Sequence, residues 1–449
     1  MTRLDNTTFV GDMMAKIDGY WMMPAGFGVS VLPLGIIVLA LGIPHSLAEE
    51  WPRFRGPTGQ GVSNERKLPV LWSSTENVAW KTVIPGEGWS SPVIWGDRVF
   101  VTTATDEGRS CHVICVDRKS GAIVWDQEVL KQEPRSKRKD NSYATPTPVT
   151  DGERVFAVFG SGGIAALSVD GKLEWTNEEI HFFSKHGLGA SPILQDDLLI
   201  MPFDGSSDGE DDLVGFKKGW DGGVVLAIDK KSGTVRWRGK RGLSRLAHVT
   251  PMVLESNHES QLVSAAGDVI QGHRISNGEL IWTIQSQGEG VTPSIVKGKE
   301  FVYTCSGFEK PTIRAVKLGG QGNVTETHIA WEQKEGVPSI ASLLYVEPYV
   351  YAVTDAGVLT CFDALTGKDV WKERVRGKHT SSPVFADGRI YLLSELDGES
   401  ILIEPGPVYQ EIGRNILNEV CKGTMAVSKG NLFIRSAQHL YCIGPKPVD

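Results

Sequence analysis

An internal repeat constrains the fold of this chain more than any other feature, because a period of about 40–50 residues defines one structural unit that must stack on copies of itself. A phrase of the form small-small-Ser/Thr-Pro-apolar occurs six times, and two degenerate copies bring the total to eight. The six phrases begin at Trp89, Tyr143, Gly189, His248, Gly290 and Thr380, and the degenerate copies begin at Ser339 and Lys422. The chain therefore contains eight units.

Each unit consists of two hairpins. Most phrases lead into a tight turn, such as Asp-Gly at Asp151 or Asp387, followed by an apolar run. Glycine accepts the positive φ that such a turn requires. The units then end alike, as in CVDRKSGAIVW over residues 115–125, with a small residue, Asp, Gly and Trp at fixed spacing. This pattern predicts a third strand, a Gly turn and a fourth strand anchored by its Trp, so the unit is a four-stranded antiparallel sheet.

Eight such sheets predict an all-β protein, an eight-bladed β-propeller, because radial stacking buries both faces of every sheet. The eighth unit stops after its third strand, at HLYCIGPKPVD, whereas a strand around Trp80 precedes the first phrase. We expect this N-terminal strand to close the ring by completing the last blade, with Trp80 beside the segment that ends in Cys442. The tryptophans should lie in the core, and Tyr409 should take the Trp position in the seventh blade.

The chain divides into three parts. Residues 1–48 are a signal peptide or a membrane anchor, residues 49–71 an N-terminal extension, and residues 72–449 the propeller. Residues 27–43 are apolar and uncharged, and Ser46 and Ala48 fit the small-residue rule for cleavage before Glu49. Cleavage would release the protein into the periplasm or cell envelope, whereas an uncleaved segment 27–43 would anchor it to the inner membrane.

The charge of the chain argues against nucleic acid as a partner. The net charge is −8, and acidic and basic residues are interspersed, so no positive field exists to attract phosphates. One basic run, residues 131–139, departs from this pattern. It is interpreted as a solvated loop, with contact to an anion or lipid as the alternative.

The repeat also explains the cysteines. Cys115, Cys361 and Cys442 occupy the small-residue position of their units, which predicts buried thiols. Cys111 is too far from Cys115 along one strand for a disulfide. The remaining two cysteines are Cys305 and Cys421, and no pair has the spacing of a zinc site.

An acidic stretch, FDGSSDGEDDLVGFKKGWDGG over residues 203–223, falls between the second and third strands of the third blade. Its candidate metal ligands Asp204, Ser206, Asp208 and Asp212 match positions 1, 3, 5 and 9 of an EF-hand calcium loop, and Gly209 matches position 6. The twelfth position, which normally supplies a bidentate Glu, is Gly215. A partial calcium loop, a solvated acidic loop and a ligand contact all stay open.

The motif Ala/Cys-apolar-Asp-x-x-Ser/Thr-Gly-x-x-x-Trp resembles the tryptophan-docking repeat of quinoprotein-type propellers. That superfamily includes the pyrroloquinoline quinone alcohol dehydrogenases and the propeller lipoprotein of outer-membrane β-barrel assembly. The resemblance covers residues 72–444. The stretch WPRFRGPTGQGVSNE, from Trp51, also resembles the opening of exported bacterial members.

The resemblance implies a fold more strongly than a function. The dehydrogenases hold their quinone against a disulfide between adjacent cysteines, and no two cysteines are adjacent in this sequence. We therefore expect a monomeric binding or scaffold protein without cofactor or catalysis, whose partner is an envelope protein or a small ligand. The alternative is a pyrroloquinoline quinone-dependent oxidoreductase, alcohol or sugar dehydrogenase-like, that also uses calcium.

The superfamily also implies where a site would lie. Its ligand face carries the loops that enter the first strands, and here these loops hold Trp89, Tyr143, His186, Arg245, His248, Glu289, His379 and Lys422. These residues are expected to ring the channel mouth and to suit an anionic or aromatic ligand. For the quinone alternative, Arg245 or Lys422 would pair with cofactor carboxylates, Asp204 would help hold calcium and Glu289 would act as general base.

Overall fold

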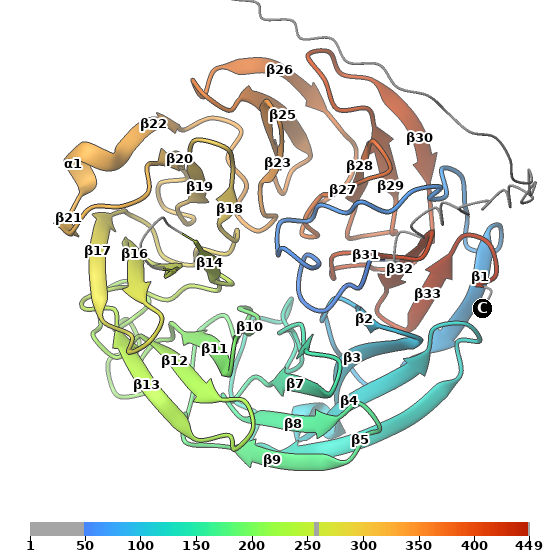
Figure 1. Cartoon of the computed structure of the whole chain (residues 1–449), viewed down its shortest axis with the longest axis horizontal. Helices are drawn as coiled ribbons and strands as arrows, with labels where there is room; N and C mark the ends of the chain where they lie inside the picture. The colour runs from blue at the N-terminus through green and yellow to red at the C-terminus, as the bar shows by residue number, and fades with distance from the viewer. Residues whose placement is uncertain (1–48, 256–259, 448–449) are drawn as a thin grey trace, which may run out of the picture. The chain divides into compact units, whose positions relative to one another are not determined.

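The described part of the chain is an eight-bladed propeller. The computed structural model describes residues 49–255 and 260–447, and these form eight antiparallel sheets of four strands each, one of which gains a short fifth strand. Figure 1 shows the sheets arranged as a ring around a central axis. The predicted signal or anchor segment, residues 1–48, lies outside the described residues. Among the described residues, no helix combines the length and the apolar character needed to cross a membrane.

The strands follow the predicted order in every blade. The first strands, nearest the axis, are β2 (Val93–Trp95), β6 (Val149–Thr150), β10 (Ile193–Gln195), β14 (Met252–Leu254), β18 (Val296–Lys297), β23 (Leu344–Val346), β27 (Val384–Ala386) and β31 (Ala426–Ser428). The second strands are β3 (Arg98–Thr105), β7 (Arg154–Val158), β11 (Leu198–Phe203), β15 (Gln261–Ala266), β19 (Val302–Cys305), β24 (Tyr349–Val353), β28 (Arg389–Leu393) and β32 (Asn431–Arg435).

The outer strands complete each sheet. The third strands are β4 (Ser110–Asp117), β8 (Ile164–Ser168), β12 (Val224–Asp229), β16 (Val269–Arg274), β20 (Ile313–Val316), β25 (Val358–Asp363), β29 (Ser400–Ile403) and β33 (His439–Ile443). The fourth strands are β5 (Ile123–Lys131), β9 (Leu173–Asn177), β13 (Val235–Lys240), β17 (Leu280–Gln285), β22 (Ile329–Gln333), β26 (Asp369–Arg374), β30 (Glu411–Asn415) and, for the eighth blade, β1 (Val78–Val83). The only helical turns of the described chain are η1 (Asp106–Gly108) and α1 (Thr325–His328).

The Ser/Thr-Pro phrase joins neighbouring blades. Ser91 N–H donates to the hydroxyl of Thr147 in the second blade, and Thr147 N–H donates to Ser191 in the third. Within the described residues, the same bond links five further neighbouring pairs: Ser191 to Thr250, Ser294 to Ser342, Ser342 to Ser382, Ser382 to Thr424, and Thr424 back to Ser91. The hydroxyls satisfy buried backbone N–H groups next to the axis, which explains why the repeat keeps this residue type.

The ring closes as predicted. β1 pairs antiparallel with β33, and Trp80 lies opposite Cys442. Cys115 and Cys361 lie opposite Trp125 and Trp371 in the same way. All six cysteines are buried and unpaired, as expected for small residues of the core.

The docking tryptophans bridge adjacent blades. Trp125 Nε1 donates to Val169 O at 3.1 Å, and its ring covers Gly171 of the next blade. Trp282 differs, because it donates to Gln261 Oε1 in its own blade at 2.9 Å. A short strand, β21 (Gly322–Asn323), pairs parallel with β17 beside this ring, and the ring folds inward over Gly272.

The prediction for Tyr409 is wrong. Tyr409 precedes β30, and its ring packs on Trp371 with centroids 5.5 Å apart. In the seventh blade Gly413 lies opposite Leu402, at the position where other blades have Trp, and the bulge that follows is the same as in those blades. Trp72, which precedes β1, is buried nearby, and its backbone N–H donates to Asn415 Oδ1 at 2.7 Å. Val70, from the same segment outside the repeat, is the residue that packs over Gly413.

The N-terminal extension is part of the propeller. Trp51 is fully buried and exchanges two backbone hydrogen bonds with Ile94, at 3.0 and 2.8 Å, and Val62 forms a parallel bridge with Phe385 in the seventh blade. Between these points Arg55 is buried, and its Nη2 donates to Leu343 O at 2.6 Å. In Figure 1 this blue segment crosses the middle of the ring. It closes part of the channel at the end where the first strands finish.

Candidate functional site

The predicted site residues lie at the opposite end of the channel. All eight stand on connections that precede first strands. Because strand direction alternates, the connections between second and third strands emerge at the same end. We call this end the mouth face, defined by these two sets of connections.

An imidazole pair lies on the mouth face over the third to fifth blades. The rings of His186 and His248 have centroids 6.0 Å apart, and His186 also meets Phe216 edge-on at 5.5 Å. His248 is buried, and neither of its ring nitrogens has a hydrogen-bond partner among the described residues. Burial, with a smaller contribution from His186, lowers the pKa of His248 to about 3. His248 is therefore neutral at pH 7 and packs as an apolar ring.

An ion-pair network surrounds this imidazole pair. Lys217 Nζ lies 2.8 Å from Glu289 and 3.1 Å from Glu309. Arg245 donates two hydrogen bonds to Asp268, at 2.8 and 2.7 Å, and a third to Glu309 at 2.6 Å. The hydrogen bond to Glu289 raises the pKa of Lys217. Arg245 and one carboxylate oxygen of Glu289 are thus already paired within the protein, whereas Glu289 Oε2 has no hydrogen-bond partner among the described residues.

A second cluster lies across the mouth. Lys422 Nζ sits 4.6 Å above the ring of Trp89, donates to Asp140 O at 2.6 Å, and lies 3.8 Å from Glu395. Lys378 pairs with the same Glu395 at 3.0 Å. The cation–π contact joins the eighth blade to the first, and the contact of Lys422 with Glu395 adds the seventh.

The side chains of Tyr143 and His379 each contact a backbone carbonyl of the protein. Tyr143 donates its O–H to Arg135 O at 2.6 Å, and Lys137 lies 5.0 Å from its ring centroid. His379 is fully buried, with Nε2 3.0 Å from Arg376 O. It stands on the predicted connection but presents no exposed surface to a ligand.

The basic run, residues 131–139, contacts other mouth loops. Arg135 forms an ion pair with Asp208 of the acidic stretch. Just after the run, Asn141 donates to His186 O at 2.8 Å, and Asp140 accepts from Lys422. The loop therefore connects the third blade to the eighth across the mouth.

The carboxylates of the acidic stretch form ion pairs with different basic residues. Asp204 is buried and accepts two hydrogen bonds from Arg241, at 2.9 and 2.8 Å, while Asp212 pairs with Lys185. Ser206 Oγ accepts from Lys185 N–H at 3.1 Å. No group of three His, Cys, Asp or Glu side chains in the described ranges gathers closely enough to hold a metal ion.

Two of the residues named for the quinone alternative, Asp204 and Arg245, are already paired within the protein. Arg241 takes both oxygens of Asp204, and Asp268 with Glu309 takes the guanidinium of Arg245. Asp204 and Arg245 are therefore not free to contact calcium or the quinone carboxylates, whereas Glu289 Oε2 is buried without a hydrogen-bond partner among the described residues.

Sequence reasoning missed the exposed apolar residues of the mouth face. Leu243 is 74% exposed, Leu213 41% and Phe308 40%. Leu213 belongs to the acidic stretch, and Leu243 and Phe308 stand on the neighbouring connections. Three large apolar side chains on neighbouring mouth connections were a visible signal, because exposed apolar residues gathered on one face mark a candidate contact surface.

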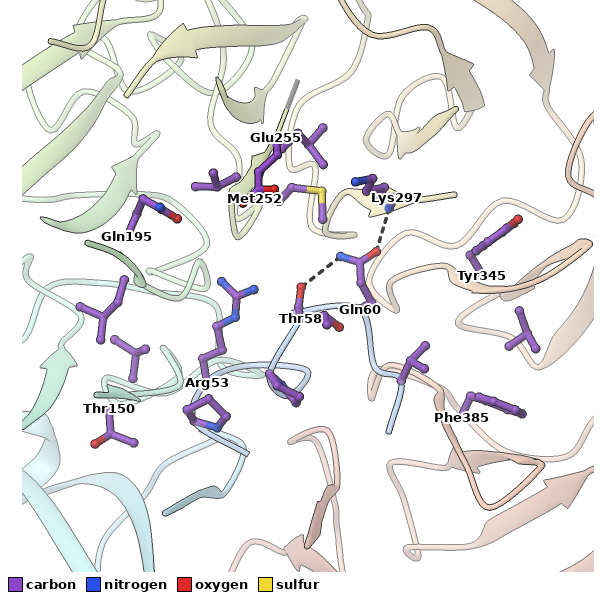
Figure 2. A pocket seen from close by; sticks show the side chains of 18 of the residues that line it. Arg53, Thr58, Gln60, Thr150, Gln195, Met252, Glu255, Lys297, Tyr345 and Phe385 are labelled. Carbon is purple, nitrogen blue, oxygen red and sulfur yellow. Dashed lines mark hydrogen bonds between the residues drawn. The ribbon is translucent and has the colours of Figure 1, made fainter. Parts of the chain in front are cut away.

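A pocket at the other end of the channel was also missed. It has a volume of about 780 Å³ and lies between the N-terminal extension and the final residues of several first strands. Figure 2 shows Arg53, Thr58 and Gln60 of the extension facing Gln195, Met252 and Tyr345 of the blades. Gln60 holds the extension in place by accepting from Lys297 N–H at 2.7 Å.

Comparison with known proteins assigns this chain to a family. The family model described as outer membrane protein assembly factor BamB matches residues 64–239, 112–306 and 324–404. These matches together cover more than half of the chain. The chain belongs to the BamB family. No curated protein matches it.

Solved structures show how widely the BamB-family fold is shared. BamB from Moraxella catarrhalis superposes with a TM-score of 0.55 at 16% identity, over 82% of this chain and 99% of that one. A europium-containing methanol dehydrogenase gives a TM-score of 0.59 at 13% identity, over 87% and 90%. The computationally designed Ika8 protein gives 0.55 at 11% identity, over 80% and 98%. At these identities the likeness concerns the fold alone.

Proposed function

We propose that this protein is an exported propeller that binds a protein partner in the cell envelope through its mouth face, without catalysis of its own. One observation carries the proposal. Lys217, Arg245 and Glu289 of the mouth are held in ion pairs, whereas Leu213, Leu243 and Phe308 stay exposed on the same face. Exposed apolar side chains next to a satisfied polar network are typical of a protein-binding surface.

The family supports the same proposal. The matching family model is described as an outer membrane assembly factor, which agrees with an envelope location and a protein partner. Export requires the segment within residues 1–48, whose cleavage or retention N-terminal sequencing of the mature protein would establish.

Partner capture tests the proposed surface. Full-length protein, its Leu243→Asp variant and its Phe308→Asp variant would each be used to recover partners from an envelope fraction, followed by direct binding to the purified partner. We expect each substitution to weaken binding by about tenfold or more, since a buried apolar contact becomes a desolvated charge. Leu365→Asp is the matched control, because Leu365 is 62% exposed on the turn between β25 and β26, at the opposite end. Equal binding by all three variants would contradict the proposal.

The fold shared with a methanol dehydrogenase favours a second candidate, the quinone oxidoreductase. Reconstitution with pyrroloquinoline quinone and calcium, followed by an absorption spectrum and a dye-linked alcohol assay, separates the two. A binding protein should show neither a spectral shift nor alcohol oxidation. An oxidoreductase should show both.

A further inference from the structure

The pocket of Figure 2, which we call the base pocket, lies away from the mouth face. Its walls come from the N-terminal extension and from the ends of first strands in the second to seventh blades. Its volume of about 780 Å³ falls within the range of small-molecule sites. The proposed protein-binding function uses none of its residues.

Arg53 is the charged residue that sets the character of the base pocket. Its side chain points from the extension into the space near Gln195 and Thr58 (Figure 2). Its Nε is buried without a hydrogen-bond partner among the described residues. Burial lowers the pKa of Arg53, and no carboxylate of a described residue offsets this effect. Arg53 therefore differs from Arg241 and Arg245, whose guanidinium groups are paired.

The other charges lining the pocket are at its rim. Lys297, Glu255 and Glu347 are all exposed, and Glu347 pairs with Lys299 at 2.9 Å. Exposed charges contribute little, because water screens them. The desolvated charge inside the pocket is thus that of Arg53.

The remaining walls are apolar with a few amides. Leu194, Met252, Tyr345 and Phe385 supply apolar and aromatic surface, and Gln195 supplies a polar group. One partly buried cation among apolar walls is suited to a ligand that combines an anionic head with an apolar body. Arginine binds a planar carboxylate through two parallel hydrogen bonds.

We propose that the base pocket binds a small organic carboxylate with an apolar body, and that Arg53 is its counter-ion. The carboxylate would take the unpartnered guanidinium, and the apolar body would pack against Met252 and Tyr345. The ligand would stabilise the extension against the blades, because a ligand that binds only the folded state raises its stability.

Benzoate is the probe that tests the proposal, titrated into the full-length chain by calorimetry and by saturation-transfer NMR. We expect saturable binding with Kd below about 10 mM, the affinity that a ligand of this size reaches at ordinary ligand efficiency. Benzamide, which has the same shape without the charge, should bind at least about tenfold more weakly. Inorganic phosphate should not displace benzoate, because it lacks the apolar body. Equal binding of benzamide, or displacement by phosphate, would overturn the proposal.

Substitutions locate the site. Arg53→Gln should lower benzoate affinity by about tenfold or more, and Arg53→Lys should retain part of it. Arg98→Gln is the matched control, since Arg98 stands near the same end but pairs outside the pocket with Asp170 at 2.6 Å. Circular dichroism and thermal melting of each variant establish that it is folded. Unchanged benzoate affinity in folded Arg53→Gln would overturn the assignment. Leu243→Asp should leave benzoate binding intact, so this proposal and the mouth-face proposal can fail separately.

Discussion

Trp80 in the first strand lies opposite Cys442 in the last strand, so the two ends of the propeller form one blade. Trp80 also holds the neighbouring blade, because its Nε1 donates to Arg118 O at 2.8 Å and its ring covers Gly121. Gly121 has a φ of 75°, and a Cβ there would come within 2.7 Å of the indole. One side chain thus closes the sheet and anchors it to the next.

Trp80→Ala should lower the free energy of unfolding by about 3–5 kcal/mol, because it removes a large buried ring and leaves a cavity. Urea denaturation followed by fluorescence would measure the loss. Val83→Ala is the control within the same strand, since Val83 is 65% exposed and should change stability by less than about 0.5 kcal/mol. Similar effects of the two substitutions would contradict closure through Trp80.

The repeat made the propeller predictable. Its hydroxyl, glycine and tryptophan positions set strand register locally, so Cys115 opposite Trp125 and Cys442 opposite Trp80 followed from spacing alone. The positions of mouth residues such as Arg245 on connections entering first strands followed as well. Which side chains pair with one another did not follow, because Asp268 and Glu309, the partners of Arg245, lie on different connections.

The features outside the repeat could not be predicted in this way. The extension containing Arg53 has no second copy in the chain, so no internal comparison indicated that it enters the channel. Tyr409 was misassigned because the seventh blade has Gly413, which carries no side chain, at the position where the other blades have Trp. Trp282 pairs in parallel with Gly322, a residue 40 positions later that lies outside the repeated strands.

The buried pair of Asp204 and Arg241 should stabilise the acidic stretch. Asp204→Asn leaves the guanidinium buried and uncompensated, so we expect a loss of about 3–5 kcal/mol in the free energy of unfolding. Asp212→Asn removes a more exposed partner of Lys185 and should change it by less than about 1 kcal/mol. The double variant Asp204→Leu with Arg241→Met should regain most of the loss.

Calcium titration of the same proteins tests the partial calcium loop. With Asp204 held by Arg241, we expect no saturable terbium or calcium binding below millimolar concentration. Calcium that raises the melting temperature of the unsubstituted protein but not of Asp204→Asn would contradict this expectation and support the metal site.

Glu419 should make the ring closure sensitive to acid. Burial alone would raise its pKa, but hydrogen bonds from Lys81, Ser436, Tyr441 and His439 lower it from about 4.5 to about 2. A carboxyl group with a lowered folded-state pKa adds stability above its unfolded pKa, and this stability is lost as pH falls toward the folded pKa. We therefore expect a loss of about 2–3 kcal/mol between pH 6 and pH 2 from this group.

Urea denaturation across that pH range would measure the effect. Glu419→Gln should be less stable at pH 6 and should show a flatter pH dependence than the unsubstituted protein. Glu76→Gln, at an exposed carboxylate of the N-terminal segment, should leave both the stability and its pH dependence unchanged. A Glu419→Gln variant that keeps the full acid sensitivity would show that other carboxylates carry it.

Trp72 should stabilise the propeller as strongly as a docking tryptophan of the repeat. It is buried with Leu417 and Met425 in the core shared by the seventh and eighth blades, and its N–H is held by Asn415. Trp72→Ala should therefore lower the free energy of unfolding by about 3–5 kcal/mol. Leu71→Ala, at the adjacent residue that is 63% exposed, should have an effect below about 0.5 kcal/mol. If both substitutions were equally mild, the segment before β1 would be an appendage, and the seventh blade would have to be stable with only Gly413 at its tryptophan position.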